Sequence, residues 1–144
     1  SKRLERMADR GNKMTTIDFT DEEINTLKNL LESKDKELYL INKSFHTVWF
    51  QSESSEAELR IALLSNVQLT ISRVCVSHKR KGIITSILQE LIKMCKKRNI
   101  HRIVMQSVLT LECSAFCKKN KFIPDPSASI VLNEFVGGDW VLNI

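Results

Sequence analysis

The order of the secondary-structure elements predicted along this chain indicates an α/β domain with a mixed sheet. The chain has 144 residues, of which 42% are hydrophobic and 27% charged, as expected for one globular domain. Apolar residues alternate along some short segments and recur every three or four residues in others, which predicts strands interspersed with helices. The predicted elements are a helix over residues 21–33, strands over 37–41, 45–50, 58–64 and 67–76, a helix from Gly82 into residues 96–99, a strand over 102–108, a helix over 111–120 and strands over 129–135 and 140–144.

The first half of the chain is expected to begin the sheet after one helix. Residues 1–15 lack apolar periodicity and are expected to be a flexible leader, so that residues 16–144 form a single domain. Thr20 and Glu23 have the spacing of a capping box, which predicts that a helix starts here. The two segments that follow are rich in aromatic and β-branched residues, and residues 42–44 between them suit a hairpin connection. The next segment, 58–64, fits a strand or a short helix, and a strand is predicted.

The second half is expected to complete the sheet around two helices. Residues 67–76 alternate as a half-buried strand, but its last valines stay on the apolar face only if a bulge near Arg73 shifts the register. After Gly82, isoleucines and leucines recur at helical period, which is the clearest helix pattern in the sequence. A break is predicted at residues 124–126, and the last two strands are expected to turn around residues 137–139.

A basic turn leads directly into the N-terminus of the helix that follows Gly82. Lys79, Arg80 and Lys81 precede this glycine. The first amides of a helix have no partner within it and carry partial positive charge, and glycine lets a ligand approach the backbone closely, so a phosphate or pyrophosphate is the predicted ligand. A Walker loop and a dinucleotide fingerprint are excluded, because the turn has one glycine and lacks their spacing.

Residues 74–91, VCVSHKRKGIITSILQEL, resemble the central motif of the GCN5-related N-acetyltransferase (GNAT) superfamily: a strand, a turn of the form Arg/Gln-x-x-Gly-x-Gly/Ala, and a helix. Lys79, Gly82 and Ile84 take the three defined positions of that turn. The resemblance implies a GNAT-like mixed, mostly antiparallel central sheet flanked by helices, with acetyl-CoA as co-substrate. It further implies that the backbone of residues 74–76 pairs with the pantetheine arm and that the amides of residues 79–84 hold the pyrophosphate. The implied cofactor-binding residues are Val74, Cys75, Val76, Lys79, Arg80, Lys81, Gly82, Ile83, Ile84 and Thr110.

The resemblance continues through residues 114–124, SAFCKKNKFIP, which look like the family's second motif, Ala-x-x-Phe/Leu-Tyr-x-x-x-Gly-Phe. Cys117 stands where the family commonly has a Tyr that protonates the departing CoA thiolate. Lys121 stands at the Gly position, and Thr110 lies near the position where many members have Asn. A thiol has an ordinary pKa of about 8.5 and can donate a proton at neutral pH, so Cys117 is the candidate catalytic acid. The alternative is a small residue packed on a helix face.

The sequence leaves the general base open. Acetyl transfer to an amine needs the neutral amine, and a carboxylate or a histidine can take its proton directly or through water. Each candidate can equally be a solvated surface group. The candidates are Glu53, Glu56, Glu58, Glu112, Glu134, Asp139, His46 and His78.

The resemblance implies an acetyl-CoA-dependent N-acetyltransferase that moves acetyl to an amine of a protein, peptide or small molecule by direct attack. The departures at Ile84, Cys117 and Lys121 keep an alternative open: a catalytically degenerate domain of the same fold that uses its net charge of +5 to bind nucleic acid or an acidic protein. No metal site is predicted, because the four cysteines lack ligand spacing. Reduced cysteines and the lack of a long apolar run predict a cytoplasmic protein without membrane contact. A homodimer is compatible with the resemblance, since members of this superfamily often pair through edge strands.

Overall fold

The computed structural model describes residues 18–74 and 80–144 of the chain. Its elements are α2 (Asp21–Asp35), β1 (Tyr39–Ser44), β2 (Thr47–Ser52), β3 (Glu58–Leu64), β4 (Gln68–Ser72), α3 (Lys81–Lys97), β5 (Arg102–Val108), α4 (Leu111–Lys119), β6 (Ile123–Val131) and β7 (Val136–Asn143). The strands form one sheet in the order β1-β2-β3-β4-β5-β7-β6. Among these strands β4 and β5 pair in parallel, and the other neighbours pair antiparallel. The predicted α/β class, with a mixed, mostly antiparallel sheet flanked by helices, is confirmed.

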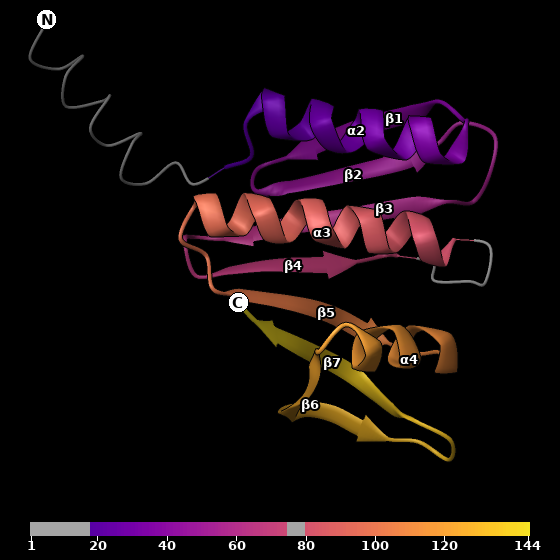
Figure 1. Cartoon of the computed structure of the whole chain (residues 1–144), viewed down its shortest axis with the longest axis vertical. Coiled ribbons are helices and arrows are strands. Elements are labelled where there is room, and N and C mark those ends of the chain that lie inside the picture. The colour runs from indigo at the N-terminus through magenta and orange to yellow at the C-terminus, as the bar shows by residue number, and fades with distance from the viewer. Residues whose placement is uncertain (1–17, 75–79) are drawn as a thin grey trace, which may run out of the picture.

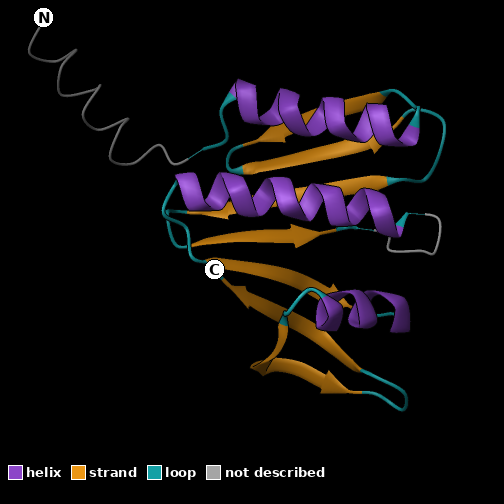
Figure 2. Cartoon of the chain, viewed as in Figure 1, coloured by secondary structure: helices purple, strands orange, loops and turns teal. Residues whose placement is uncertain are grey.

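The helices α2 and α3 lie side by side across one face of β1 to β4, and α4 packs against β5 and β7 (Figures 1 and 2). The alternation along β3 explains this layering. Leu59, Ile61 and Leu63 are buried in the core, whereas Glu58 and Arg60, which alternate with them, point to the opposite face. A stripe of isoleucines and leucines along α3 packs on the same core, as the helical period predicts.

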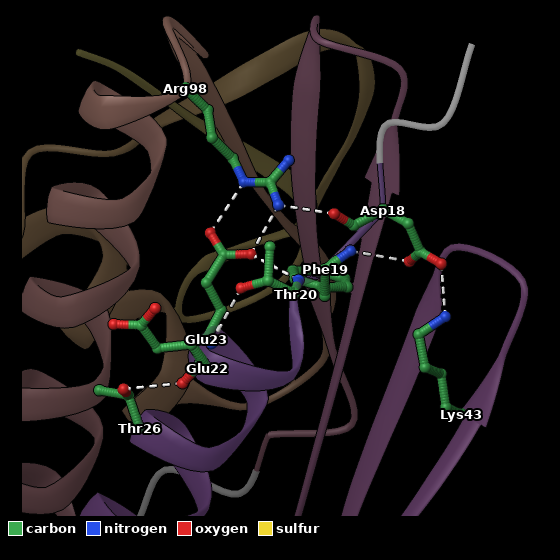
Figure 3. A network of polar contacts seen from close by, with 8 residues as sticks. All are labelled: Asp18, Phe19, Thr20, Glu22, Glu23, Thr26, Lys43 and Arg98. Carbon is green, nitrogen blue, oxygen red and sulfur yellow. Dashed lines mark hydrogen bonds and ion pairs between the residues drawn. The ribbon is translucent and has the colours of Figure 1, made fainter. Parts of the chain in front are cut away.

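One end of the α2–α3 pair is held by a polar network around Glu23 (Figure 3). Thr20 and Glu23 form the predicted capping box at the start of α2. Arg98, the C-cap of α3, binds the Glu23 carboxylate in a bidentate manner at 2.8 and 2.6 Å. Both charges lie at the helix end that the helix dipole favours, so this pair joins the two helices at little electrostatic cost.

Both predicted hairpin connections differ from the observed turns. The turn between β1 and β2 uses residues 45–46 in place of 42–44, because the pairing extends to Ser44 and Thr47. The last hairpin turns at residues 132–135, and the predicted turn residues 137–139 lie within β7. Gly138 has φ 85°, and a Cβ there would lie 2.3 Å from the carbonyl oxygen of Ala128, so this glycine serves the close approach of β6 to β7.

The break predicted at residues 124–126 is also wrong. These residues lie inside β6, with a register shift between Pro124 and Ser129. Since β6 is an edge strand of the sheet, a proline without an N–H group can be accommodated there.

Lys121, which follows α4, has the left-handed backbone conformation that glycine adopts most readily, with φ 69°. This is the position at which the second motif has Gly. Lys121→Gly should therefore raise the free energy of unfolding by about 1 kcal/mol, or the melting temperature by about 3 °C. Thermal and urea unfolding measure the effect. Lys118→Gly, which places glycine within α4, should lower stability by about 1 kcal/mol, and equal effects of the two changes would contradict the prediction.

Candidate functional site

A cleft of about 950 Å³ lies where β4 and β5 separate. The two strands pair in parallel up to Ile71 and Met105. Just beyond that pair, Arg73 and Ser107 both have left-handed backbones, with φ 52° and 56°, and both line the cleft. Such conformations cost a non-glycine residue roughly 1–2 kcal/mol, and they occur preferentially at functional sites. The strand predicted to run through a bulge near Arg73 to residue 76 ends earlier: β4 stops at Ser72, and Arg73 with its left-handed backbone follows it.

The start of α3 forms a cationic wall beside this cleft. Arg80 is the N-cap of the helix and lines the cleft, and Lys81 and Gly82 follow in the first turn. A Cβ on Gly82 would meet no atom of residues 18–74 and 80–144 within 4 Å, so the described part of the chain leaves open space in front of this residue. The helix has no acidic residue in its first turn, so the partial positive charge of its N-terminus is not neutralised from within that turn.

Ile84 was expected to contact the cofactor and does not face this space. Its side chain is 3% exposed and belongs to the core, and its amide already donates a hydrogen bond of 3.0 Å to the carbonyl oxygen of Arg80. The amides of Lys81, Gly82 and Ile83 occupy the positions in the first turn that have no helical acceptor. The side chain of Ile84 therefore packs under the helix, outside the cleft lining, and its role in cofactor binding stays a prediction.

The guanidinium of Arg80 is held by residues from two other elements. Its Nη2 atom lies 3.2 Å from the carboxylate of Asp35, at the end of α2, and 3.4 Å from the hydroxyl of Tyr39, at the start of β1. The Tyr39 hydroxyl in turn donates a hydrogen bond to Asp35. Arg80 is thus a preorganised positive group in the cleft wall.

The structure describes only some of the other predicted cofactor residues. Val74 is half-buried, packs against the core and lines the cleft. Thr110 also lines the cleft, and its side chain accepts a 3.1 Å hydrogen bond from the amide of Cys113 as the N-cap of α4. Cys75, Val76 and Lys79 lie outside the described residues.

Two cysteines that lie one turn apart on α4 differ in their position relative to the cleft. Cys117, the predicted acid, is fully buried, whereas Cys113 lines the cleft. Hydrogen bonding between the two thiols lowers the pKa of Cys113 and, together with burial, raises that of Cys117. Cys117 therefore keeps its proton, and its thiol hydrogen-bonds to the sulfur of Cys113. Because α4 starts at the cleft and runs away from it, only the N-terminal cysteine of the pair reaches the cleft.

Two of the candidate bases reach the cleft, from the side opposite α3. Glu56 and Glu58 both line it. Glu56 is exposed, whereas Glu58 is half-buried and accepts a 3.1 Å hydrogen bond from the indole Nε1 of Trp49. The guanidinium of Arg60 lies 5.9 Å from the centroid of the Trp49 ring, and this cation–π contact further restrains the indole that binds Glu58. Glu58 is the carboxylate whose position in the cleft is defined by a neighbour.

The remaining candidate bases do not line this cleft. Asp139 accepts a 2.9 Å hydrogen bond from the amide of Ser107 and so stabilises the kink in β5. His78 lies outside the described residues. Those outside the cleft lining are Glu53, Glu112, Glu134, Asp139 and His46.

Residues 18–74 and 80–144 contain neither a candidate metal cluster nor a candidate membrane-spanning helix. Within these ranges no group of three or more histidine, cysteine, aspartate or glutamate residues could hold a metal ion. None of the helices in the same ranges is long and apolar enough to span a bilayer.

Several solved chains are similar in structure to this chain. Ard1 from Thermoplasma volcanium is 13% identical, with a TM-score of 0.49, over 88% of this chain and 95% of that one. A probable acetyltransferase of the GNAT family from Chromobacterium violaceum is 12% identical, with a TM-score of 0.48, over 82% and 79%. A chain of the NatC complex bound to Gag peptide and CoA is 13% identical, with a TM-score of 0.44, over 87% and 92%. No family model and no curated protein matches the sequence.

Proposed function

We propose that this chain is an acetyl-CoA-dependent N-acetyltransferase. The observation that carries the proposal is one cleft lined by Arg80 of the cationic wall at the start of α3, by a carboxylate wall formed by Glu56 and Glu58 at the start of β3, and by the Cys113 thiol of α4. Its volume of about 950 Å³ is at the upper end of the range of ligand sites. The motif resemblance of residues 74–91 supports the same assignment.

The cationic wall suits the phosphate groups of CoA. Three amides of the first turn of α3, the guanidinium of Arg80 and the open space at Gly82 are features that bind a pyrophosphate. Lys79 and Lys81 would add positive charge, and Val74 would lie along the pantetheine arm. Because the side chain of Ile84 lies in the core, this departure from the motif does not weaken the proposal.

The carboxylate wall suits an amine acceptor. In the proposed reaction, the amine nitrogen attacks the carbonyl carbon of the thioester, Glu58 takes the amine proton, and the carbon–sulfur bond breaks to release the CoA thiolate. Cys113 replaces Cys117 as the proposed proton donor to that thiolate, because Cys113 lines the cleft. The lowered pKa of Cys113 brings a thiol closer to the operating pH, where proton transfer is most efficient. The acceptor is an amine of a protein, a peptide or a small molecule.

Calorimetric titration with acetyl-CoA tests the first step. Binding in the micromolar range, followed by release of free CoA when amine-bearing peptides or polyamines are added, is the expected result. Absence of binding at millimolar acetyl-CoA would overturn the proposal. If the same protein then shifted labelled nucleic acid in a salt-dependent manner, the basic surface would be the functional one.

A further inference from the structure

Two ion pairs join α2 and α3, one at each end, and they differ in their relation to the helix dipoles. Glu23 and Arg98 lie at the ends that favour their charges. Asp35 is the last residue of α2 and Arg80 is the N-cap of α3, so each of these charges lies at the end that disfavours it. An electrostatically unfavourable arrangement that borders a cleft suggests a functional role.

The unfavourable pair is also well buried. The side chains of Arg80 and Asp35 are 15% and 10% exposed, and Tyr39 beside them is 4% exposed. Burial and the hydrogen bond to Asp35 raise the pKa of Tyr39 to about 12, so its hydroxyl remains a donor to that carboxylate at neutral pH. Solvent therefore screens this cluster less than it screens an exposed ion pair.

The cluster of Arg80, Asp35 and Tyr39 presents its positive group to the cleft. Arg80 lines the cleft, whereas Asp35 and Tyr39 do not. The positive end of the pair faces the space where an anion would bind, and the negative end lies behind it. Without this counter-charge, the long side chain of Arg80 would be repelled by the N-terminus of α3 and would lose rotamer entropy only when a ligand bound.

We propose that Asp35 and Tyr39 are positioning residues that hold the Arg80 guanidinium at the cleft wall as a binding group for the pyrophosphate of CoA. This inference rests on the function proposed above. It assigns a binding role to the end of α2 and the start of β1, two segments that lie outside the resemblance in residues 74–91.

The test compares two substitutions that break matched ion pairs between the same helices. Asp35→Asn should weaken the binding of both CoA and inorganic pyrophosphate roughly tenfold in calorimetry, and Tyr39→Phe should cause a smaller loss in the same direction. Glu23→Gln should leave both affinities unchanged while lowering the melting temperature. Binding of pantetheine, which lacks the pyrophosphate, should not respond to Asp35→Asn, whereas a purely structural role would weaken all three ligands.

The possible outcomes separate this inference from the proposed function. If the wild-type chain binds CoA and Asp35→Asn behaves like Glu23→Gln, the positioning role is wrong and the proposed function stands. Tighter binding by Asp35→Asn would also overturn it, because Asp35 would then compete with the ligand for Arg80. Tyr39→Phe, which retains the ring, decides the question if Asp35→Asn fails to fold. A wild-type chain that binds neither CoA nor pyrophosphate overturns both proposals.

Discussion

Replacing Glu58 by glutamine is expected to slow acetyl transfer by roughly 10²–10⁴-fold without changing the affinity for acetyl-CoA. The carboxylate lines the cleft and is oriented by the indole of Trp49. Glutamine keeps an oxygen that can accept that hydrogen bond, so the fold and the cleft shape should persist while the proton acceptor is lost. The measurement is the rate of CoA release at saturating acetyl-CoA, with calorimetry on the same variant.

Glu56→Gln is the matched control for this prediction. Glu56 lines the same cleft, but it is exposed and lies outside the Trp49 hydrogen bond. Its replacement should cause a much smaller loss of rate. The defect of Glu58→Gln should also shrink as the pH rises, because more of the acceptor amine is then already neutral. Equal losses in the two variants, or a pH-independent defect, would argue against Glu58 as the base.

Gly82→Asp should stabilise the fold and abolish cofactor binding at the same time. Gly82 is the second residue of α3, where an acidic side chain complements the helix dipole and aspartate has a higher helix propensity than glycine. The free energy of unfolding should rise by about 1 kcal/mol. Affinity for acetyl-CoA should fall by at least roughly a hundredfold, since like charges about 4 Å apart repel by about 4 kcal/mol at an effective dielectric constant of 20.

Gly82→Asn separates charge from bulk in this experiment. The two side chains have nearly the same size, and the open space at Gly82 accepts either of them. Asn should therefore weaken acetyl-CoA binding less than Asp does. Thermal unfolding and calorimetry on both variants give the comparison. An Asp variant that binds acetyl-CoA like the wild type would show that the start of α3 does not hold the phosphates.

The helices and most strands could be predicted because their signals are local. The capping box at Thr20, the apolar period after Gly82 and the alternation through Ile71 each lie within a few residues of the element that they predict. Turns were predicted less well. Gly137 and Gly138 are typical turn residues, yet they serve close packing within β7, because the approach of β6 and of β5 excludes a Cβ at these positions.

The candidate site was predicted in part. The basic turn before α3 indicated an anion site from sequence alone, and Arg80 of this turn lines the cleft, with Gly82 following it in the first turn of α3. The position of Cys117 in the motif suggested the acid, but the direction of α4 brings Cys113 to the cleft instead. A helix pattern defines which residues share a face, and it contains no information about which end of that face meets a neighbouring strand.

Local spacing along the chain was therefore sufficient for the α/β class and for the elements around Gly82, and it predicted an anion site at the start of a helix. Which carboxylate faces that site was decided by long-range pairing. Glu58 shares the cleft with Arg80 because β3 pairs with β4 and because β4 and β5 diverge after Ile71 and Met105. Asp35 meets Arg80 only once α2 and α3 pack against each other. These contacts join residues that are distant in sequence, so they form only when the core brings the elements together.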